Sequence, residues 1–139
     1  MLLPKKHDLD VYLIRTDFSS EVRWQEICHT IREALSDLDM KARFIEDRGL
    51  DGASPLDLLP RVEGNPFYSF AMIIDRVSME SDEFPVLVLD LLEEPGRTFR
   101  VVPSNVPNVH ANLWLANMVF EDYADSVDPD GIFRGFSEE

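Results

Sequence analysis

The chain has 139 residues, 45% of them hydrophobic, and its 27 acidic against 13 basic side chains leave a formal net charge of −14 at pH 7. This length fits one domain, and the apolar content excludes a wholly disordered protein. The acidity opposes binding to nucleic-acid phosphates, and no segment approaches the ~20 apolar residues of a membrane span. We therefore expect a soluble protein that binds neither nucleic acid nor a membrane.

The cysteine content and the N-terminal residues indicate the cellular compartment. The one cysteine, Cys28, excludes a disulfide within the chain, and the beginning of the chain lacks the apolar stretch of a signal peptide. Both features favour a reducing, cytoplasmic environment. Residues 1–9 are predicted to be a flexible lead-in to a single domain that covers 1–139, because no linker or internal repeat divides the chain.

The first half of the chain alternates β-favouring runs with helical patterns. Residues 10–16, 42–46 and 68–75 are predicted strands, and 21–38 and 55–62 are predicted helices. Cys28 falls within the apolar stripe of the first helix and is predicted to be buried, whereas His29 lies beside the stripe and is predicted to be exposed. This alternation of strands and helices predicts that the three strands are parallel and joined by right-handed crossovers.

Residues 84–103 are predicted to form a β-hairpin. The first arm, 86–92, is apolar almost throughout, which is typical of a strand buried on both faces, and the second arm alternates. Glu93, Glu94, Pro95 and Gly96 supply the turn. Residues 76–83 are interpreted as a polar, acidic connection that leads into this hairpin.

The last third of the chain is less regular. Residues 104–108 are predicted to be a loop and 111–127 a helix, with a short strand at 113–115 as the alternative. The tail, 128–136, is rich in turn residues but holds three large apolar ones, so we expect it to fold back onto the domain. The whole pattern predicts an α/β domain with a mixed sheet of about five strands (β-α-β-α-β, a β-hairpin, then α) and helices packed on it.

One aspartate follows each of the three predicted parallel strands: Asp17, Asp47 and Asp75. The carboxyl ends of parallel strands share one edge of a sheet, where open α/β sheets place their ligands, so these carboxylates could hold Mg²⁺ or another hard cation. Aspartate is also common at strand ends and helix starts, and Arg15 and Arg76 could simply neutralise it. A metal site and a structural role are both open.

Motifs of known chemistry are missing from the sequence. There is no phosphate loop, no dinucleotide-binding glycine fingerprint and no paired-cysteine zinc motif, and no cofactor is expected. The three histidines, His7, His29 and His110, lie in unrelated contexts and suggest no nucleophilic triad. Residues 128–131 begin like a calcium loop but lack its remaining ligands, so we predict a turn.

Three motifs resemble those of a bacterial, largely actinobacterial, domain family of unknown function: RTDF at 15–18, EPGRTFRV at 94–101, and a third made of NL at 112–113, ANM at 116–118 and FED at 120–122, with Val119 where the family pattern has an acidic residue. The resemblance spans nearly the whole chain and implies a single domain without an established activity. It directs attention to six polar motif residues that could converge on a pocket, although the two asparagines could instead bond to backbone groups. These residues are Asp17, Arg97, Arg100, Asn112, Asn117 and Glu121.

The acidity and the lack of catalytic motifs favour a non-catalytic binding domain. We expect a basic protein partner, held by an acidic surface as in immunity-type inhibitors of basic toxins. The chain could be such an inhibitor or an accessory protein. The alternative is a metal-dependent or small-molecule-processing enzyme that uses the carboxylates at the strand ends. The sequence gives no indication of an oligomeric state.

Overall fold

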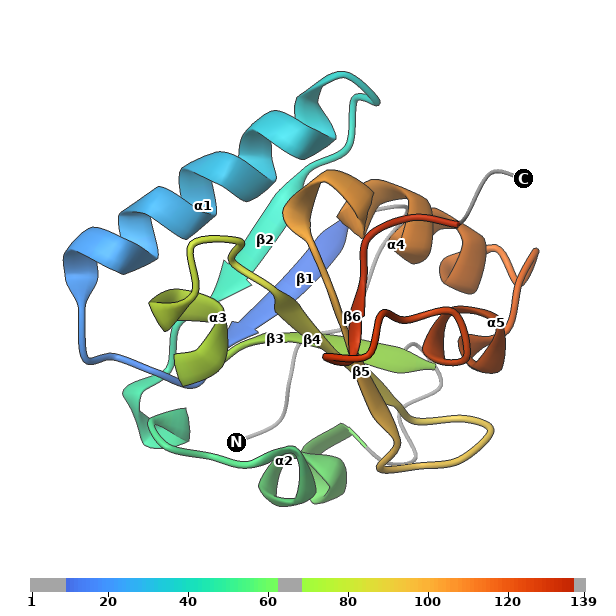
Figure 1. The fold of residues 1–139 in the computed structure, drawn as a ribbon. Coiled ribbons are helices and arrows are strands. Elements are labelled where there is room, and N and C mark those ends of the chain that lie inside the picture. Colours follow the sequence, from blue (N-terminus) through green and yellow to red (C-terminus); the bar gives the residue numbers. More distant parts are fainter. Residues whose placement is uncertain (1–9, 63–68, 137–139) are drawn as a thin grey trace.

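The computed structural model describes residues 10–62 and 69–136, which form a mixed β-sheet with helices on both faces (Figure 1). The described strands pair in the order β2-β1-β3-β4-β5-β6. The predicted α/β domain with a mixed sheet of about five strands is confirmed, and the C-terminal segment adds a sixth. The strands are β1 (Val11–Arg15), β2 (Ala42–Ile45), β3 (Phe70–Ile74), β4 (Val86–Asp90), β5 (Thr98–Val101) and β6 (Ile132–Phe133).

Pairing directions agree with the predicted connections. β1 lies between β2 and β3 and runs parallel to both, with Leu13 opposite Phe44 on one side and Met72 on the other. β4 is antiparallel to β3 and to β5, and β6 is parallel to β5. The three parallel strands and the hairpin are thus confirmed, although the first arm ends at Asp90 and not at residue 92. Because β6 pairs with β5, the tail does fold back onto the domain.

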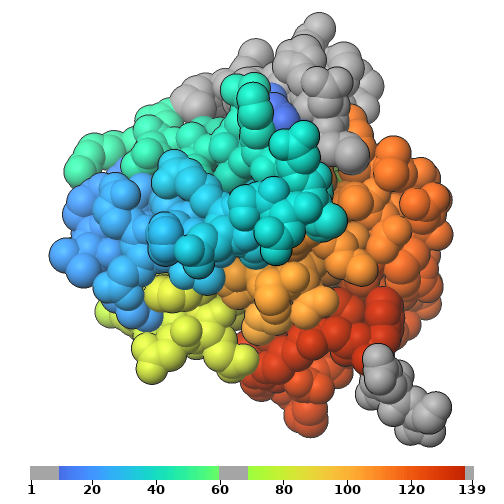
Figure 2. All heavy atoms as spheres, turned by 90° about the horizontal axis from the view of Figure 1, so that it is seen from above, coloured from blue at the N-terminus to red at the C-terminus, as the bar shows by residue number. Residues whose placement is uncertain are grey.

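Helices cover the two faces of the sheet. α1 (Glu21–Ser36) and α4 (Val106–Trp114) contact each other on one face, and Figure 2 looks onto this layer, with α1 in blue and α4 in orange. α2 (Pro55–Val62) packs on the other face. The shorter elements are α3 (Arg76–Glu80), α5 (Phe120–Ala124) and the 3-10 helices η1 (Arg48–Leu50) and η2 (Pro103–Asn105). Within the described residues, no helix has the length and apolar character to cross a bilayer.

The core has two parts, because successive strand residues point to opposite faces of the sheet. Leu13 and Met72 pack under α1, whereas Ile14 and Ile73 pack with Leu58 of α2. The apolar stripe of α1 is buried along its length, as predicted, at Trp24, Ile27, Cys28, Ile31 and Leu35.

The two side chains singled out on α1 lie as predicted. Cys28 is buried, and burial raises the pKa of its thiol to about 12, so the thiol is protonated at neutral pH. His29 is exposed. The helix begins where Ser20 accepts a hydrogen bond from the Arg23 amide at 3.2 Å, and it ends at Ser36, two residues before the predicted end.

The connection predicted at 76–83 contains a helix that the sequence interpretation missed. Asp75 and Ser78 form a capping box at the start of α3: the Ser78 amide donates to Asp75 at 3.1 Å and the Ser78 hydroxyl accepts from the Asp75 amide at 3.2 Å. This reciprocal pair satisfies amides that would otherwise lack partners. It permits a helix of five residues that carries too little apolar periodicity to be predicted.

The single helix predicted at 111–127 is wrong. α4 begins at Val106, inside the predicted loop, because Pro107 lies in the first turn, where its missing N–H costs nothing. α4 ends at Trp114, and Ala116 follows with a left-handed φ of 59° that no helix can continue through. α5 then begins at Phe120. The alternative strand at 113–115 is also excluded, since Leu113 and Trp114 are helical.

Candidate functional site

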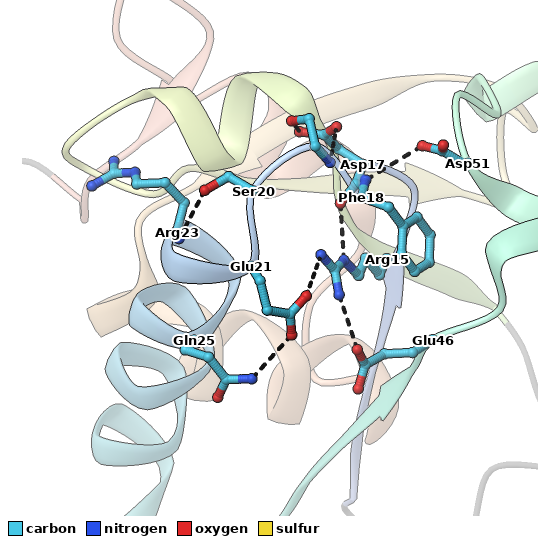
Figure 3. Close-up of polar contacts among 10 residues, drawn as sticks. Arg15, Asp17, Phe18, Ser20, Glu21, Arg23, Gln25, Glu46 and Asp51 are labelled. Atoms are coloured by element: carbon cyan, nitrogen blue, oxygen red, sulfur yellow. Dashed lines mark hydrogen bonds and ion pairs between the residues drawn. The ribbon is translucent and has the colours of Figure 1, made fainter.

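The ends of β1, β2 and β3 meet at one edge of the sheet, here called the carboxyl edge. Arg15, the last residue of β1, is almost completely buried there, with 2% of its side chain exposed. Its Nε donates to the Asp17 carbonyl at 2.9 Å, its Nη1 to Glu46 at 3.0 Å and its Nη2 to Glu21 at 3.2 Å (Figure 3). One guanidinium thus joins β1 to the segment after β2 and to the first turn of α1.

Aromatic rings hold the same guanidinium. Its central carbon lies 4.3 Å from the centroid of the Phe18 ring and 4.4 Å from that of Trp24. Cation–π contact of this kind stabilises a desolvated arginine. All three guanidinium nitrogens of Arg15 donate hydrogen bonds, and two aromatic rings contact the same group. Two residues of the RTDF motif, Arg15 and Phe18, therefore stabilise this edge of the sheet.

Each of the three strand-end aspartates has its own partners. Asp17 accepts the Ser19 amide at 3.1 Å and the Ser19 hydroxyl at 3.0 Å. Asp47 accepts the Gly49 amide at 2.9 Å and so begins η1. Asp75 begins α3 and also forms a bidentate pair with Arg100, at 2.9 and 2.7 Å.

The pKa of Asp75 reflects these partners. Burial acts to raise it, but the hydrogen bonds and the charge of Arg100, together with bonds from Ser78, outweigh burial and lower the pKa below its ordinary value. The lowered pKa keeps the Asp75 carboxylate ionised at neutral pH, so it forms an ion pair with Arg100.

The predicted metal site gains no support from this geometry. Although Asp17, Asp47 and Asp75 all follow strands at the carboxyl edge, their oxygens bond to different groups. Among residues 10–62 and 69–136, no group of three His, Cys, Asp or Glu side chains is placed to hold a metal ion. In the structure, these three aspartates accept hydrogen bonds that cap loops and helices, and Asp75 also forms an ion pair.

Two neighbouring cavities that share three lining residues lie at the opposite end of β3, and together we call them the hairpin pocket, with an apolar and a polar compartment. Its apolar compartment measures about 140 Å³ and its polar compartment about 300 Å³, and Asp90, Glu93 and Val119 line both. The other residues that line the apolar compartment are Ser69, Phe70, Leu92, Leu113, Ala116, Met118 and Phe120. The other residues that line the polar compartment are Glu94, Arg97 and Glu121.

One wall of the hairpin pocket is the turn between β4 and β5, and Asp90 fixes its shape. Asp90 is 2% exposed, and its carboxylate accepts the amides of Leu92 at 3.0 Å, Glu93 at 3.3 Å and Glu94 at 2.9 Å. Gly96, with a φ of 104°, closes the turn by donating to the Asp90 carbonyl at 3.0 Å. The Asp90 carboxylate is thus bonded to backbone amides and fixes the conformation of this wall.

The other wall is the connection between α4 and α5. The Ala116 amide donates to Leu113 at 3.3 Å and the Asn117 amide to Asn112 at 2.9 Å, which is the bonding pattern of a Schellman helix end with Ala116 in the left-handed position. Asn112 also donates through its side chain to the buried Tyr123 hydroxyl at 3.0 Å, which ties α4 to α5.

Charge in the hairpin pocket is unbalanced. Four carboxylates and one guanidinium, that of Arg97, line the polar compartment. Arg97 pairs with Asp125 at 2.7 Å and with Glu94 at 3.7 Å, and the hydrogen bond that Arg97 donates to Asp125 raises the pKa of Arg97. Glu93 and Glu121 form no ion pair with any residue in the described part of the chain. The pocket therefore presents net negative charge.

Apolar side chains surround the opening. Leu92 is 67% exposed and Val119 is 46% exposed, and both line the pocket, while Leu115 is exposed on the same connection between α4 and α5. Exposed large apolar residues next to a cavity are typical of a contact surface.

The six polar residues expected from the resemblance occupy different places. Arg97 and Glu121 lie together in the hairpin pocket. Asn117 is exposed on the connection between two lining residues, and Asn112 bonds to Tyr123. Asp17 and Arg100 lie at the carboxyl edge. The apolar lining was missed, because its members look like ordinary core residues in the sequence.

Comparisons with known proteins place the chain in a family. A family model described as "Domain of unknown function (DUF6924)" matches residues 10–136. No curated protein matches the chain.

Two solved structures of prolyl-tRNA synthetase from Cryptosporidium parvum share 11% identity with it. One, complexed with L-proline and AMP, has a TM-score of 0.48, and the other, complexed with halofuginone and AMPPNP, has 0.49; each covers 86% of this chain and 24% of the synthetase chain. The chain spans about a quarter of those synthetase chains, and a likeness at this level says nothing of function. The family model, in contrast, covers almost the entire sequence, and the chain belongs to this family of domains of unknown function.

Proposed function

We propose that the protein is a non-catalytic binding domain and that its hairpin pocket binds a basic protein partner. The observation that carries this proposal is the juxtaposition of an apolar cavity with two carboxylates, Glu93 and Glu121, that form no ion pair within residues 10–62 and 69–136. Stable interfaces commonly centre on an apolar pocket that receives one anchoring side chain, within a polar rim. The hairpin pocket has both parts.

The charge of the whole molecule supports the same kind of partner. A formal net charge of −14 attracts cationic proteins over long range and speeds their association. Carboxylates at the rim would then pair with lysine or arginine side chains of the partner. Exposed Leu92 and Val119 would lose contact with water on binding, which adds a favourable apolar term.

The chemical groups of the pocket favour binding over catalysis. Among its described lining residues, the ionisable groups are four carboxylates and Arg97, and Ser69 carries the one hydroxyl. The Asp90 carboxylate is occupied by three backbone amides. A nucleophile needs an adjacent base that can accept its proton, and this lining does not supply such a pair.

A titration with a basic peptide tests the proposal. The probe is a synthetic peptide of repeated Leu-Lys-Gly units, added to ¹⁵N-labelled protein while amide NMR signals are followed. We expect shifts at residues 92–97 and 113–121, and weaker binding as salt rises, because screening reduces attraction between exposed charges.

Matched charge variants separate a site from general acidity. Glu93→Gln/Glu121→Gln removes two charges from the hairpin pocket, and Glu26→Gln/Glu33→Gln removes two from exposed positions on α1. We expect the first pair to weaken peptide binding and the second to leave it nearly unchanged. Equal weakening in both variants would mean that the peptide responds to net charge alone, and the proposal would be wrong.

A further inference from the structure

We infer that the hairpin pocket recognises a basic segment through one apolar side chain placed next to a lysine or arginine. The inference rests on the proposed function and names the chemistry of the motif that the partner presents. It follows from the size of the apolar compartment, from the rigidity of its walls and from the charge beside it.

Size limits what can enter the apolar compartment. A cavity of about 150 Å³ lined by Leu, Ile and Phe holds one benzene molecule, whereas pockets for drug-sized ligands measure about 300–1,000 Å³. The apolar compartment, at about 140 Å³, matches the smaller case. It therefore suits a single side chain such as leucine, isoleucine, methionine or phenylalanine.

The walls come from separate elements that are each held in place. Phe70 begins β3, Leu113 belongs to α4 and Phe120 begins α5. The turn after β4 is fixed by the three amide bonds to Asp90, and the end of α4 by its Schellman bonds. A preformed compartment loses little conformational entropy when a side chain enters, which favours binding.

The carboxylates of the polar compartment determine which residue stands next to the apolar side chain of the motif. Asp90, Glu93 and Val119 line both compartments, so the group next to a side chain that fills the apolar compartment lies beside the polar compartment. Glu93 and Glu121 can each accept hydrogen bonds from a cation, while Arg97 is already bound to Asp125. The neighbouring group on the ligand is therefore cationic.

Three peptides test the motif on the wild-type protein: repeated Leu-Lys-Gly, Ser-Lys-Gly and Leu-Gln-Gly. Because burial of a leucine side chain contributes at least about tenfold in affinity, we expect Ser-Lys-Gly to bind about tenfold more weakly than Leu-Lys-Gly. We expect Leu-Gln-Gly to lose the salt dependence. If Ser-Lys-Gly binds as tightly as Leu-Lys-Gly at the same amides, the apolar anchor is wrong, while the proposed function stands. If neither lysine peptide binds, the proposed function itself fails.

A variant that fills the cavity tests the location of the anchor. Ala116→Leu enlarges a lining residue, and the control Asn117→Leu adds the same side chain to the exposed neighbour that does not line the pocket. We expect Ala116→Leu to abolish the preference for Leu-Lys-Gly over Ser-Lys-Gly and Asn117→Leu to retain it. Thermal unfolding of both variants verifies that they fold. A preference that survives in a folded Ala116→Leu protein would overturn the inference.

Discussion

The two ends of the sheet use similar residues for different purposes. At the carboxyl edge, Arg15 and Arg100 are largely buried, and the guanidinium of Arg15 pairs with two carboxylates and that of Arg100 with one. At the hairpin pocket, carboxylates outnumber the single guanidinium of Arg97, and apolar side chains remain exposed beside them. Paired charges in the first region stabilise the fold, whereas Glu93 and Glu121 in the second, which form no ion pair with the part of the chain that the structure describes, are available to a ligand. Substitutions at the first end should therefore change stability, and those at the second should change binding.

The largest effect is expected at Arg15. Arg15→Ala removes three hydrogen bonds and the contact with the Phe18 and Trp24 rings, so we expect the free energy of unfolding to fall by about 3 kcal/mol. Urea denaturation measures this change. The control is Arg43→Ala, which removes an exposed pair with Asp10 and should cost less than about 1 kcal/mol. Equal losses in the two variants would contradict a structural role for Arg15.

The Asp75–Arg100 pair should appear in the pH dependence of stability. The pKa of Asp75 is lowered by folding, so its contribution is present above the unfolded value of about 3.9 and is lost as pH falls through the folded pKa. We expect Asp75→Asn to lower the free energy of unfolding by about 2 kcal/mol at pH 7 and by less below about pH 4. Denaturation curves across the acid range measure the difference. If Asp75→Asn lowered the free energy of unfolding equally at every pH, the ion pair would not contribute to stability.

A smaller effect, of opposite sign, is expected at Ala116. Its φ of 59° is strained for alanine but not for glycine, so Ala116→Gly should raise the free energy of unfolding by about 0.5–1 kcal/mol. Ala111→Gly, within α4, should instead lower it by about 1 kcal/mol, because glycine is unfavourable in a helix. Thermal unfolding compares the two. Destabilisation by both would argue against the Schellman end that forms the pocket wall.

The smallest effect concerns Arg97. Arg97→Gln removes the one cation of the polar compartment, and we expect affinity for the Leu-Lys-Gly peptide to rise about twofold to fivefold. Arg43→Gln removes the same charge from β2 and serves as the control. Isothermal titration calorimetry can resolve this difference. An equal rise in both variants would assign the effect to net charge and not to the pocket.

Local patterns in the sequence were sufficient for much of the fold. The apolar stripe of α1 and the apolar runs of β1, β3 and β4 are local signals, and they predicted the three parallel strands and the hairpin. α3 was missed because five residues carry no clear periodicity. β6 was missed because its two residues are a strand only through their pairing with β5. The break after Trp114 depends on a left-handed alanine, which the sequence does not signal.

The candidate site was less accessible to prediction. Arg97 and Glu121 were singled out, and they do lie in one pocket. The cavity beside them forms where Phe70 of β3 meets Leu113 and Phe120, which lie about 40 to 50 positions further along the chain and approach Phe70 only in the folded protein. Asp90 closes an apolar strand and gives no sign in the sequence of the three amides that it binds.

One measurement tests the central claim most directly: intermolecular NOEs between the leucine methyl groups of the Leu-Lys-Gly peptide and the protein. We predict NOEs to Leu113, Met118 and Phe120, the apolar lining of the hairpin pocket. NOEs confined to the carboxyl edge, for example to Phe18 and the exposed Val22, would show that the ligand binds at the other end of the sheet and would contradict the account.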